Sequence, residues 1–193
     1  MTERERLYHG MSCAAWSYLF LFVDFRLGSF NLLPNFVGYW LLLRAIAALG
    51  TERRDLTLLR PFAWILLGWN LADWGLQLAG GGLSGWFPPA ELLIGMMVLY
   101  FHFQFFTDCA ALAAAHQLPE ETLDRSLLRG RTVQAVVHTA VFLLNDAAVR
   151  FGGVWQWVQT GMAVVYVIAG FSLMRLLFRL RALFREEPAQ QTA

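Results

Sequence analysis

The sequence predicts an all-α integral membrane protein, a polytopic bundle of six transmembrane helices arranged as three helical hairpins. Of its 193 residues, 58% are hydrophobic and only 15% are charged, whereas soluble domains are about 45–50% apolar. The apolar residues gather in six runs, each near the roughly 20 residues that cross the hydrocarbon core of a bilayer. The composition therefore indicates lipid as the surrounding solvent, and a net charge of +1 does not indicate nucleic-acid binding.

The arginines predict which way the chain threads. All fifteen basic residues are arginine, and thirteen of them flank the apolar runs on one side of the membrane. These are Arg4, Arg6, Arg44, Arg53, Arg54, Arg60, Arg125, Arg129, Arg131, Arg175, Arg179, Arg181 and Arg185. Only Arg26 and Arg150 fall on the other side. Because cytoplasmic loops retain Lys and Arg, this asymmetry predicts that the N- and C-termini are both cytoplasmic.

The first hairpin is predicted to comprise helices over about 11–27 and 33–49. A polar stretch precedes the first apolar run, and no small-residue cleavage site follows that run, so an uncleaved first helix is expected. Gly28 and Ser29 favour a turn, and Pro34 has the fixed φ that suits the first turn of the next helix.

The second hairpin is predicted over about 61–83 and 90–117. Prolines open both helices, Pro61 the first and Pro88 with Pro89 the second, and a glycine-rich stretch separates them. Aromatic residues at the outer turns of the hairpins favour the depth of the lipid headgroups, which supports the assigned spans.

The third hairpin is predicted over about 132–151 and 156–178, after a charged connector with room for a short surface helix. As the sixth helix leaves the membrane, arginines alternate with apolar residues, which is typical of an amphipathic juxtamembrane extension. Its candidate contacts with anionic lipid headgroups, with simple topological anchoring as the alternative, are Arg175, Arg179, Arg181 and Arg185. The chain is therefore expected to form one six-helix domain over 1–185, followed by a flexible cytoplasmic tail over 186–193.

Ionisable side chains within the predicted helices are the best functional lead, because they are expensive in hydrocarbon and usually face protein or water. Asp24, Asp73 and Asp146 lie at similar distances from the predicted cytoplasmic helix ends, which indicates a shared depth. This similarity fits a threefold hairpin repeat and also fits chance. The predicted polar binding cluster comprises Asp24, Asn70, Asp73, His102, Asn145, Asp146 and Arg150.

Three classes of function remain open. The first is binding or transport of a small cation or polar solute through the acidic cluster. The second is a non-catalytic membrane scaffold or assembly factor in which the same polar groups only join helices. The third, an intramembrane enzyme, is disfavoured, because the string Gly82-Leu83-Ser84-Gly85 lies in an outer turn, whereas rhomboid-like serine proteases carry a similar string at the start of a buried helix.

Neither a cofactor nor a metal is expected, since the usual phosphate-binding, dinucleotide-binding and zinc-binding patterns do not occur. Counted from the predicted helix ends, His102 and His138 differ in depth by roughly 10 Å or more, which disfavours shared ligation. Cys13 and Cys109 are expected to be reduced thiols. The expected partners are the bilayer and its anionic headgroups, and the small size is compatible with a homo-oligomer.

Three strings carry a resemblance to known proteins: LPNFVGY over 33–39, YFHFQ over 100–104 and LDRSLL over 123–128. Together they resemble a family of small uncharacterised bacterial multi-spanning membrane proteins. The resemblance would cover most of the chain, and it implies a bacterial inner-membrane location. It implies no activity, so no functional residue follows from it.

Overall fold

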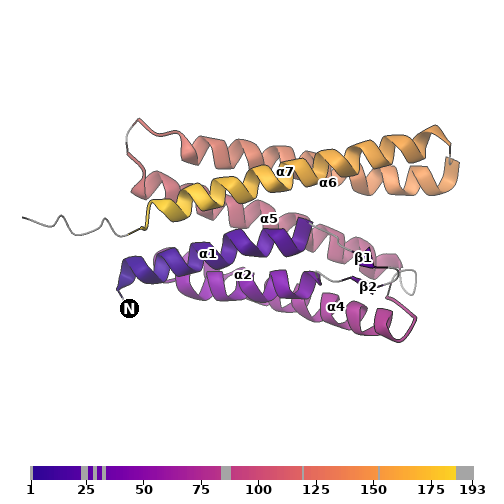
Figure 1. Cartoon of the computed structure of the whole chain (residues 1–193), viewed down its shortest axis with the longest axis horizontal. Coiled ribbons are helices and arrows are strands. Elements are labelled where there is room, and N and C mark those ends of the chain that lie inside the picture. The colour runs from indigo at the N-terminus through magenta and orange to yellow at the C-terminus, as the bar shows by residue number, and fades with distance from the viewer. Residues whose placement is uncertain are drawn as a thin grey trace, which may run out of the picture.

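The computed structural model describes residues 2–22, 26–27, 30–31, 34–83, 88–118, 120–151 and 153–185. Within these residues the chain runs back and forth along one axis as six long helices (Figure 1), which confirms the prediction of an all-α fold. They are α1 (Glu3–Phe22), α2 (Asn35–Leu49), α4 (Arg60–Leu78), α5 (Pro88–His116), α6 (Leu123–Phe151) and α7 (Val154–Ala182). The single-turn helix α3 (Arg54–Thr57) precedes α4, and a short antiparallel ribbon of β1 (Arg26–Leu27) and β2 (Phe30–Asn31) lies between α1 and α2.

The helices follow one another around the bundle nearly in chain order. α1 lies between α2 and α7, α7 packs on α6, α6 on α5, and α2 on α4. α4 and α5 touch much less, with the rings of Phe62 and Tyr100 meeting at a centroid distance of 5.3 Å. The second of the three predicted hairpins is therefore not a tightly packed pair, and each of its helices packs mainly on a neighbouring hairpin.

Glycines allow α1 and α2 to approach each other closely. A Cβ atom on Gly10 would lie 2.8 Å from Ala48 Cβ, and one on Gly38 would lie 2.7 Å from Leu21 Cγ. Small residues at a contact let two helix backbones come together and bury more of the neighbouring side chains. The core that results is continuous and rich in aromatic residues, including the fully buried Tyr18 and Phe105.

α1 begins at Glu3, earlier than the predicted start near residue 11, because polar groups cap it. Thr2 Oγ1 accepts a hydrogen bond from the Glu5 backbone N–H at 3.1 Å, and Glu5 Oε2 accepts one from the Thr2 N–H at 2.7 Å. This reciprocal arrangement is a capping box, which satisfies donors that the first helical turn leaves unpaired.

α6 begins at Leu123, so the expected short surface helix in the connector is instead the start of α6, and the predicted start at 132 is wrong. Gln117 Nε2 donates to Asp124 Oδ1 at 2.9 Å, and the Asp124 N–H donates to Gln117 Oε1 at 3.2 Å. The Gln117 amide, with the Arg125 backbone, holds the pKa of the Asp124 carboxyl below its ordinary value, because both favour the ionised form. The link between α5 and α6 is therefore strongest above that pKa and weakens as the pH falls through it.

The lateral surface of the bundle is largely apolar. Among the described residues, two helical segments, Pro89–His116 and Val154–Ala182, are long and apolar enough to cross a membrane. Only 28% and 17% of their most apolar windows are buried in the bundle, so they do not resemble the core helices of a soluble protein. Large apolar side chains also face outward on other helices, including Trp16 at 48% and Trp64 at 57% exposure.

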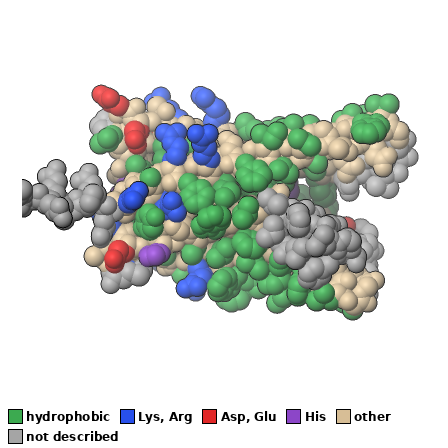
Figure 2. All heavy atoms as spheres, in the orientation of Figure 1, with side chains coloured by type: hydrophobic (Ala, Val, Ile, Leu, Met, Phe, Trp, Pro, Cys, Tyr) green, Lys and Arg blue, Asp and Glu red, His purple; other side chains and the backbone are tan. Residues whose placement is uncertain are grey.

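Charged side chains gather at the end of the bundle where the described chain starts and stops. Figure 2 shows the arginines over that half of one face and apolar side chains over the other half. Arg181 on α7 joins the two ends of the chain: its Nη1 donates to Ser12 Oγ at 3.5 Å, and its guanidinium lies 5.1 Å from the Tyr8 ring. We call the end of the bundle where these arginines gather the basic end. The predicted tail at 186–193 lies outside the described residues.

Candidate functional site

Four helices bring a hydrogen-bonding side chain to the same level of the bundle. Tyr18 on α1, His102 on α5, His138 on α6 and Tyr166 on α7 each lie about 14–16 residues from the basic end of their helix. At a rise of about 1.5 Å per residue, this places all four about 21–24 Å from that end. Antiparallel packing therefore gathers them into one polar layer within an otherwise apolar interior.

His102 forms the centre of this layer. The Tyr18 hydroxyl lies 2.9 Å from His102 Nδ1, in hydrogen-bond contact. The Tyr18 side chain is 1% exposed, and its ring packs on Phe106 at 5.1 Å and on Phe22 at 5.4 Å. The hydrogen bond satisfies a hydroxyl that has no access to water, so Tyr18 and His102 fix each other's position.

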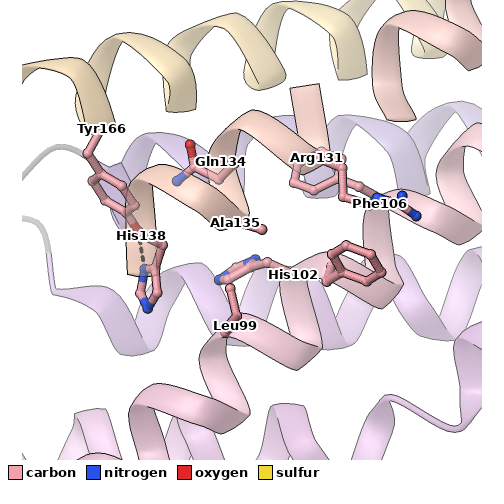
Figure 3. Close-up of a pocket in the computed structure, with 9 residues that line it drawn as sticks. Leu99, His102, Phe106, Arg131, Gln134, Ala135, His138 and Tyr166 are labelled. Carbon is pink, nitrogen blue, oxygen red and sulfur yellow. Dashed lines mark hydrogen bonds between the residues drawn. The ribbon is translucent and has the colours of Figure 1, made fainter. Parts of the chain in front are cut away.

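A small hollow of about 10 Å³ lies on one side of His102, between α5, α6 and α7 (Figure 3). His138 Nδ1 lies 3.4 Å from the Tyr166 hydroxyl at its edge. Gln134, 5% exposed, also lines the hollow, and its buried Oε1 has no hydrogen-bond partner among the described residues. The hollow has room for about one water molecule, and it offers the several polar partners that a buried water needs.

A larger cavity of about 190 Å³, here named the central cavity, lies on the other side of His102. Its polar lining consists of Asn35, Tyr39, Trp69, Asn70, His102 and Tyr166, and its apolar lining of Leu21, Phe22, Ile94 and Val98. Residues of α4 and residues of α5 face each other across it. The cavity therefore accounts for the sparse contact between these two helices.

The chemistry of the central cavity is that of neutral hydrogen-bonding groups. Among the described residues that line it, there is neither a carboxylate nor a guanidinium. Asn70 Nδ2 donates to the Leu66 carbonyl at 2.7 Å, which orients the amide and leaves Oδ1 as an acceptor. Such a lining suits a small uncharged polar molecule, because each polar group of the molecule finds a partner while no charge is left unpaired.

Of the predicted cluster, Asn70 and His102 both line the central cavity, whereas Asp73 does not. Asp73 Oδ2 accepts from Gln77 Nε2 at 2.7 Å, and Oδ1 accepts from the Leu83 backbone N–H at 2.8 Å. Gly80, with φ of +80°, turns the chain back here and ends α4 at Leu78, short of the predicted 83. Asp73 thus stabilises the turn that follows α4.

Asp73→Asn is expected to destabilise the protein by about 1–2 kcal/mol, because an amide cannot accept both hydrogen bonds that the carboxylate accepts. Unfolding in mixed detergent micelles measures this loss of stability. Asn70→Asp, one turn away on α4, is a control that places a charge in the cavity. A wild-type unfolding curve for Asp73→Asn would contradict the structural role.

The structure does not describe the side chains of the remaining members of the predicted cluster. Asp24 lies outside the described residues, and the side chains of Asn145, Asp146 and Arg150 on α6 also lie outside them. The shared depth of the three acids and the threefold repeat therefore stay predictions.

The predicted difference in depth between His102 and His138 is wrong, since both line the small hollow. The reason is the early start of α6, which moves His138 farther from the basic end than the predicted helix implied. Asp108 also lies on α5, nearer the basic end than His102. It is 2% exposed, with Oδ1 accepting from Gln104 Nε2 at 3.1 Å and Oδ2 buried without a hydrogen-bond partner among the described residues.

Sequence reasoning missed the three tyrosines of the site, Tyr18, Tyr39 and Tyr166, and did not include Gln134 in the predicted binding cluster. Tyrosines within apolar runs are ordinarily interpreted as core or as interfacial anchors. The similar distances of Tyr18 and Tyr166 from the arginine-rich helix ends were a usable signal, because residues at equal distances along antiparallel helices share a depth.

Within the described ranges, no group of three His, Cys, Asp or Glu side chains is placed to hold a metal ion. No protein-family model, curated protein or solved structure matches the chain. The resemblance to small bacterial membrane proteins therefore stays a prediction.

Proposed function

We propose that the protein is a six-span integral membrane protein that binds a small uncharged polar solute in the central cavity. The membrane placement is supported by the outward-facing apolar side chains and by the arginines gathered at one end of the bundle. On this proposal the basic end is cytoplasmic, with both termini there, in a bacterial inner membrane.

The observation that carries the proposal is a polar cavity within the apolar part of the bundle. Polar groups in hydrocarbon ordinarily bond to each other across helices and leave no space between them. Here Asn35, Asn70 and His102 instead surround about 190 Å³. A space with such a lining is suited to a molecule that makes hydrogen bonds, or to the waters that this molecule displaces.

Thermal unfolding in detergent tests the proposal with two sets of small molecules. Glycerol, erythritol and myo-inositol form the neutral set, and potassium, ammonium and tetramethylammonium chlorides form the cationic set. A neutral polyol that binds is expected to raise the midpoint by about 2–5 °C, since a ligand stabilises the state to which it binds. The cationic set is expected to leave the midpoint unchanged, because the described lining of the cavity contains no carboxylate.

Val98→Phe separates binding from the general stabilisation that polyols give to any protein. Val98 lines the cavity, so a phenylalanine there fills it and is expected to abolish the specific part of the shift. Val164→Phe, at a position 54% exposed on α7, is the matched control and should retain it. Equal shifts in wild type and Val98→Phe, or a shift with the cations alone, would contradict the proposal.

The alternative is a membrane scaffold whose polar groups only join or shape helices. The local hydrogen bonds of Asp73 and the pairing of Gln104 with Asp108 favour it, because they use polar groups structurally. If the protein is a scaffold, none of the six compounds should raise the unfolding midpoint of the wild type more than that of Val98→Phe.

A further inference from the structure

A groove of about 290 Å³ runs along the outer surface between α6 and α7, close to the basic end. We name it the α6–α7 groove, and its lining consists of Ser126, Arg129, Gly130, Val133, Ala169, Ser172 and Leu176. Gly130 brings the two helices together at its floor, where an added Cβ would lie 2.7 Å from Leu173 Cδ2. The small residues on both helices leave the groove open to the surroundings of the bundle.

The lining of the groove changes in character along the helix axis. Arg129 lies about 9 Å from the start of α6, and Ser172 on α7 lies about 15 Å from the basic end of that helix. Val133 lies at the level of Ser172 and Ala169 lies farther from the basic end, and both give the groove an apolar surface. One groove thus presents a cation, then a hydroxyl, then hydrocarbon.

The polar groups at the basic end of the groove have unused hydrogen-bonding capacity. The Arg129 guanidinium makes neither a hydrogen bond nor an ion pair with the described residues, and the same is true of the Ser172 hydroxyl. Ser126 differs, since its Oγ donates to the Thr122 carbonyl at 2.9 Å. Arg175 lies one turn from Ser172 on α7 and also has no ion-pair partner within the described chain, which adds to the positive potential there.

We propose that the α6–α7 groove binds one anionic phospholipid. Its phosphate pairs with Arg129, its glycerol esters lie at the level of Ser172, and an acyl chain lies over Val133 and Ala169. A guanidinium recognises phosphate through charge-assisted hydrogen bonds, and the apolar floor matches hydrocarbon. This inference rests on the membrane placement proposed above but not on the central cavity.

Native mass spectrometry of the protein in detergent tests the site. Phosphatidylglycerol and phosphatidylcholine with the same palmitoyl and oleoyl chains are added separately, and retained adducts are counted. Phosphatidylglycerol is expected to bind more tightly, and Arg129→Gln is expected to weaken its binding about fivefold, the effect of one arginine near an anionic lipid. Ser172→Phe fills the groove without changing charge and should weaken the binding of both lipids.

Arg54→Gln is the matched control, because Arg54 lies on α3, which packs against α2 and α5 away from the groove. Each variant is first shown to be monodisperse with wild-type helicity. The lipid site would be overturned by wild-type lipid affinity in Arg129→Gln and Ser172→Phe, or by equal losses of affinity in Arg129→Gln and Arg54→Gln. Displacement of the lipid by millimolar inorganic phosphate would also overturn it. Monodisperse protein without detergent would instead overturn the membrane placement. An unchanged polyol shift in Val98→Phe would contradict only the proposed solute binding in the central cavity.

Discussion

Gly170→Ala is expected to lower the free energy of unfolding by about 1–3 kcal/mol, the usual effect of overpacking a tight core. A Cβ atom at this position on α7 would overlap the ring of Phe22 on α1. The ring has little room to move, because Phe22 is 6% exposed and packs against Tyr18 at 5.4 Å and Tyr166 at 5.1 Å. The substitution therefore strains the α1–α7 contact that closes the bundle.

Gly161→Ala on the same helix makes the same chemical change in open space, since an added Cβ there meets nothing within 4 Å. Alanine favours helix over glycine by about 1 kcal/mol, so stability is expected to be unchanged or raised. Unfolding in mixed detergent micelles measures both variants. Equal stabilities for Gly170→Ala and Gly161→Ala would show that α1 and α7 do not pack as described.

Gly170→Ala is also expected to weaken polyol binding, because Phe22 lines the central cavity. Displacement of its ring reduces the space available to the solute. The polyol-dependent shift of the unfolding midpoint should therefore fall in Gly170→Ala and persist in Gly161→Ala.

Tyr18→Phe and His102→Leu are each expected to destabilise the protein by about 1–3 kcal/mol, because each leaves the other partner of a buried hydrogen bond unsatisfied. The distance between the Tyr18 hydroxyl and His102 Nδ1 is 2.9 Å, and Tyr18 is 1% exposed, so bulk water cannot replace His102 as the partner of the Tyr18 hydroxyl. The double variant is expected to be less destabilised than the sum of the two single variants, since it leaves neither group unpaired.

The four proteins of this double-mutant cycle are compared by unfolding in mixed micelles and by the polyol shift. His102→Leu should lose the shift, because the imidazole lines the cavity, whereas Tyr18→Phe should retain part of it. Tyr8→Phe at the basic end is a control that removes a hydroxyl outside the site. Strictly additive destabilisation would falsify the coupling between Tyr18 and His102.

The helices were predictable where apolar runs ended in proline or glycine, and less so where polar residues extended them. The sequence placed α2 within a few residues because Pro34 and the charged stretch after Leu49 bound it on both sides. It started α1 and α6 too late, because the amphipathic first turns at Glu3 and Leu123 look like connectors when charge alone is considered. In both helices the side chains of Glu5 and Gln117 accept hydrogen bonds from the backbone N–H groups of Thr2 and Asp124, and these bonds stabilise the early start.

The same error carried over to the site. Since depth was counted from the predicted helix starts, a late start for α6 separated His138 from His102. Asp73 was singled out because an acid in an apolar run usually marks a functional site. Its actual partners, Gln77 and the Leu83 backbone, lie on its own hairpin, and the Leu83 contact depends on how the turn folds back.

The sequence by itself determined the helical fold and the gathering of arginines at one end, because both follow from the local order of apolar and charged residues. Only the tertiary structure decided which polar side chains share a space. Tyr39, Asn70, His102 and Tyr166 belong to four different helices, and their meeting depends on the order in which those helices pack. The cavity between α4 and α5 is a property of the gaps between side chains, which no single helix encodes.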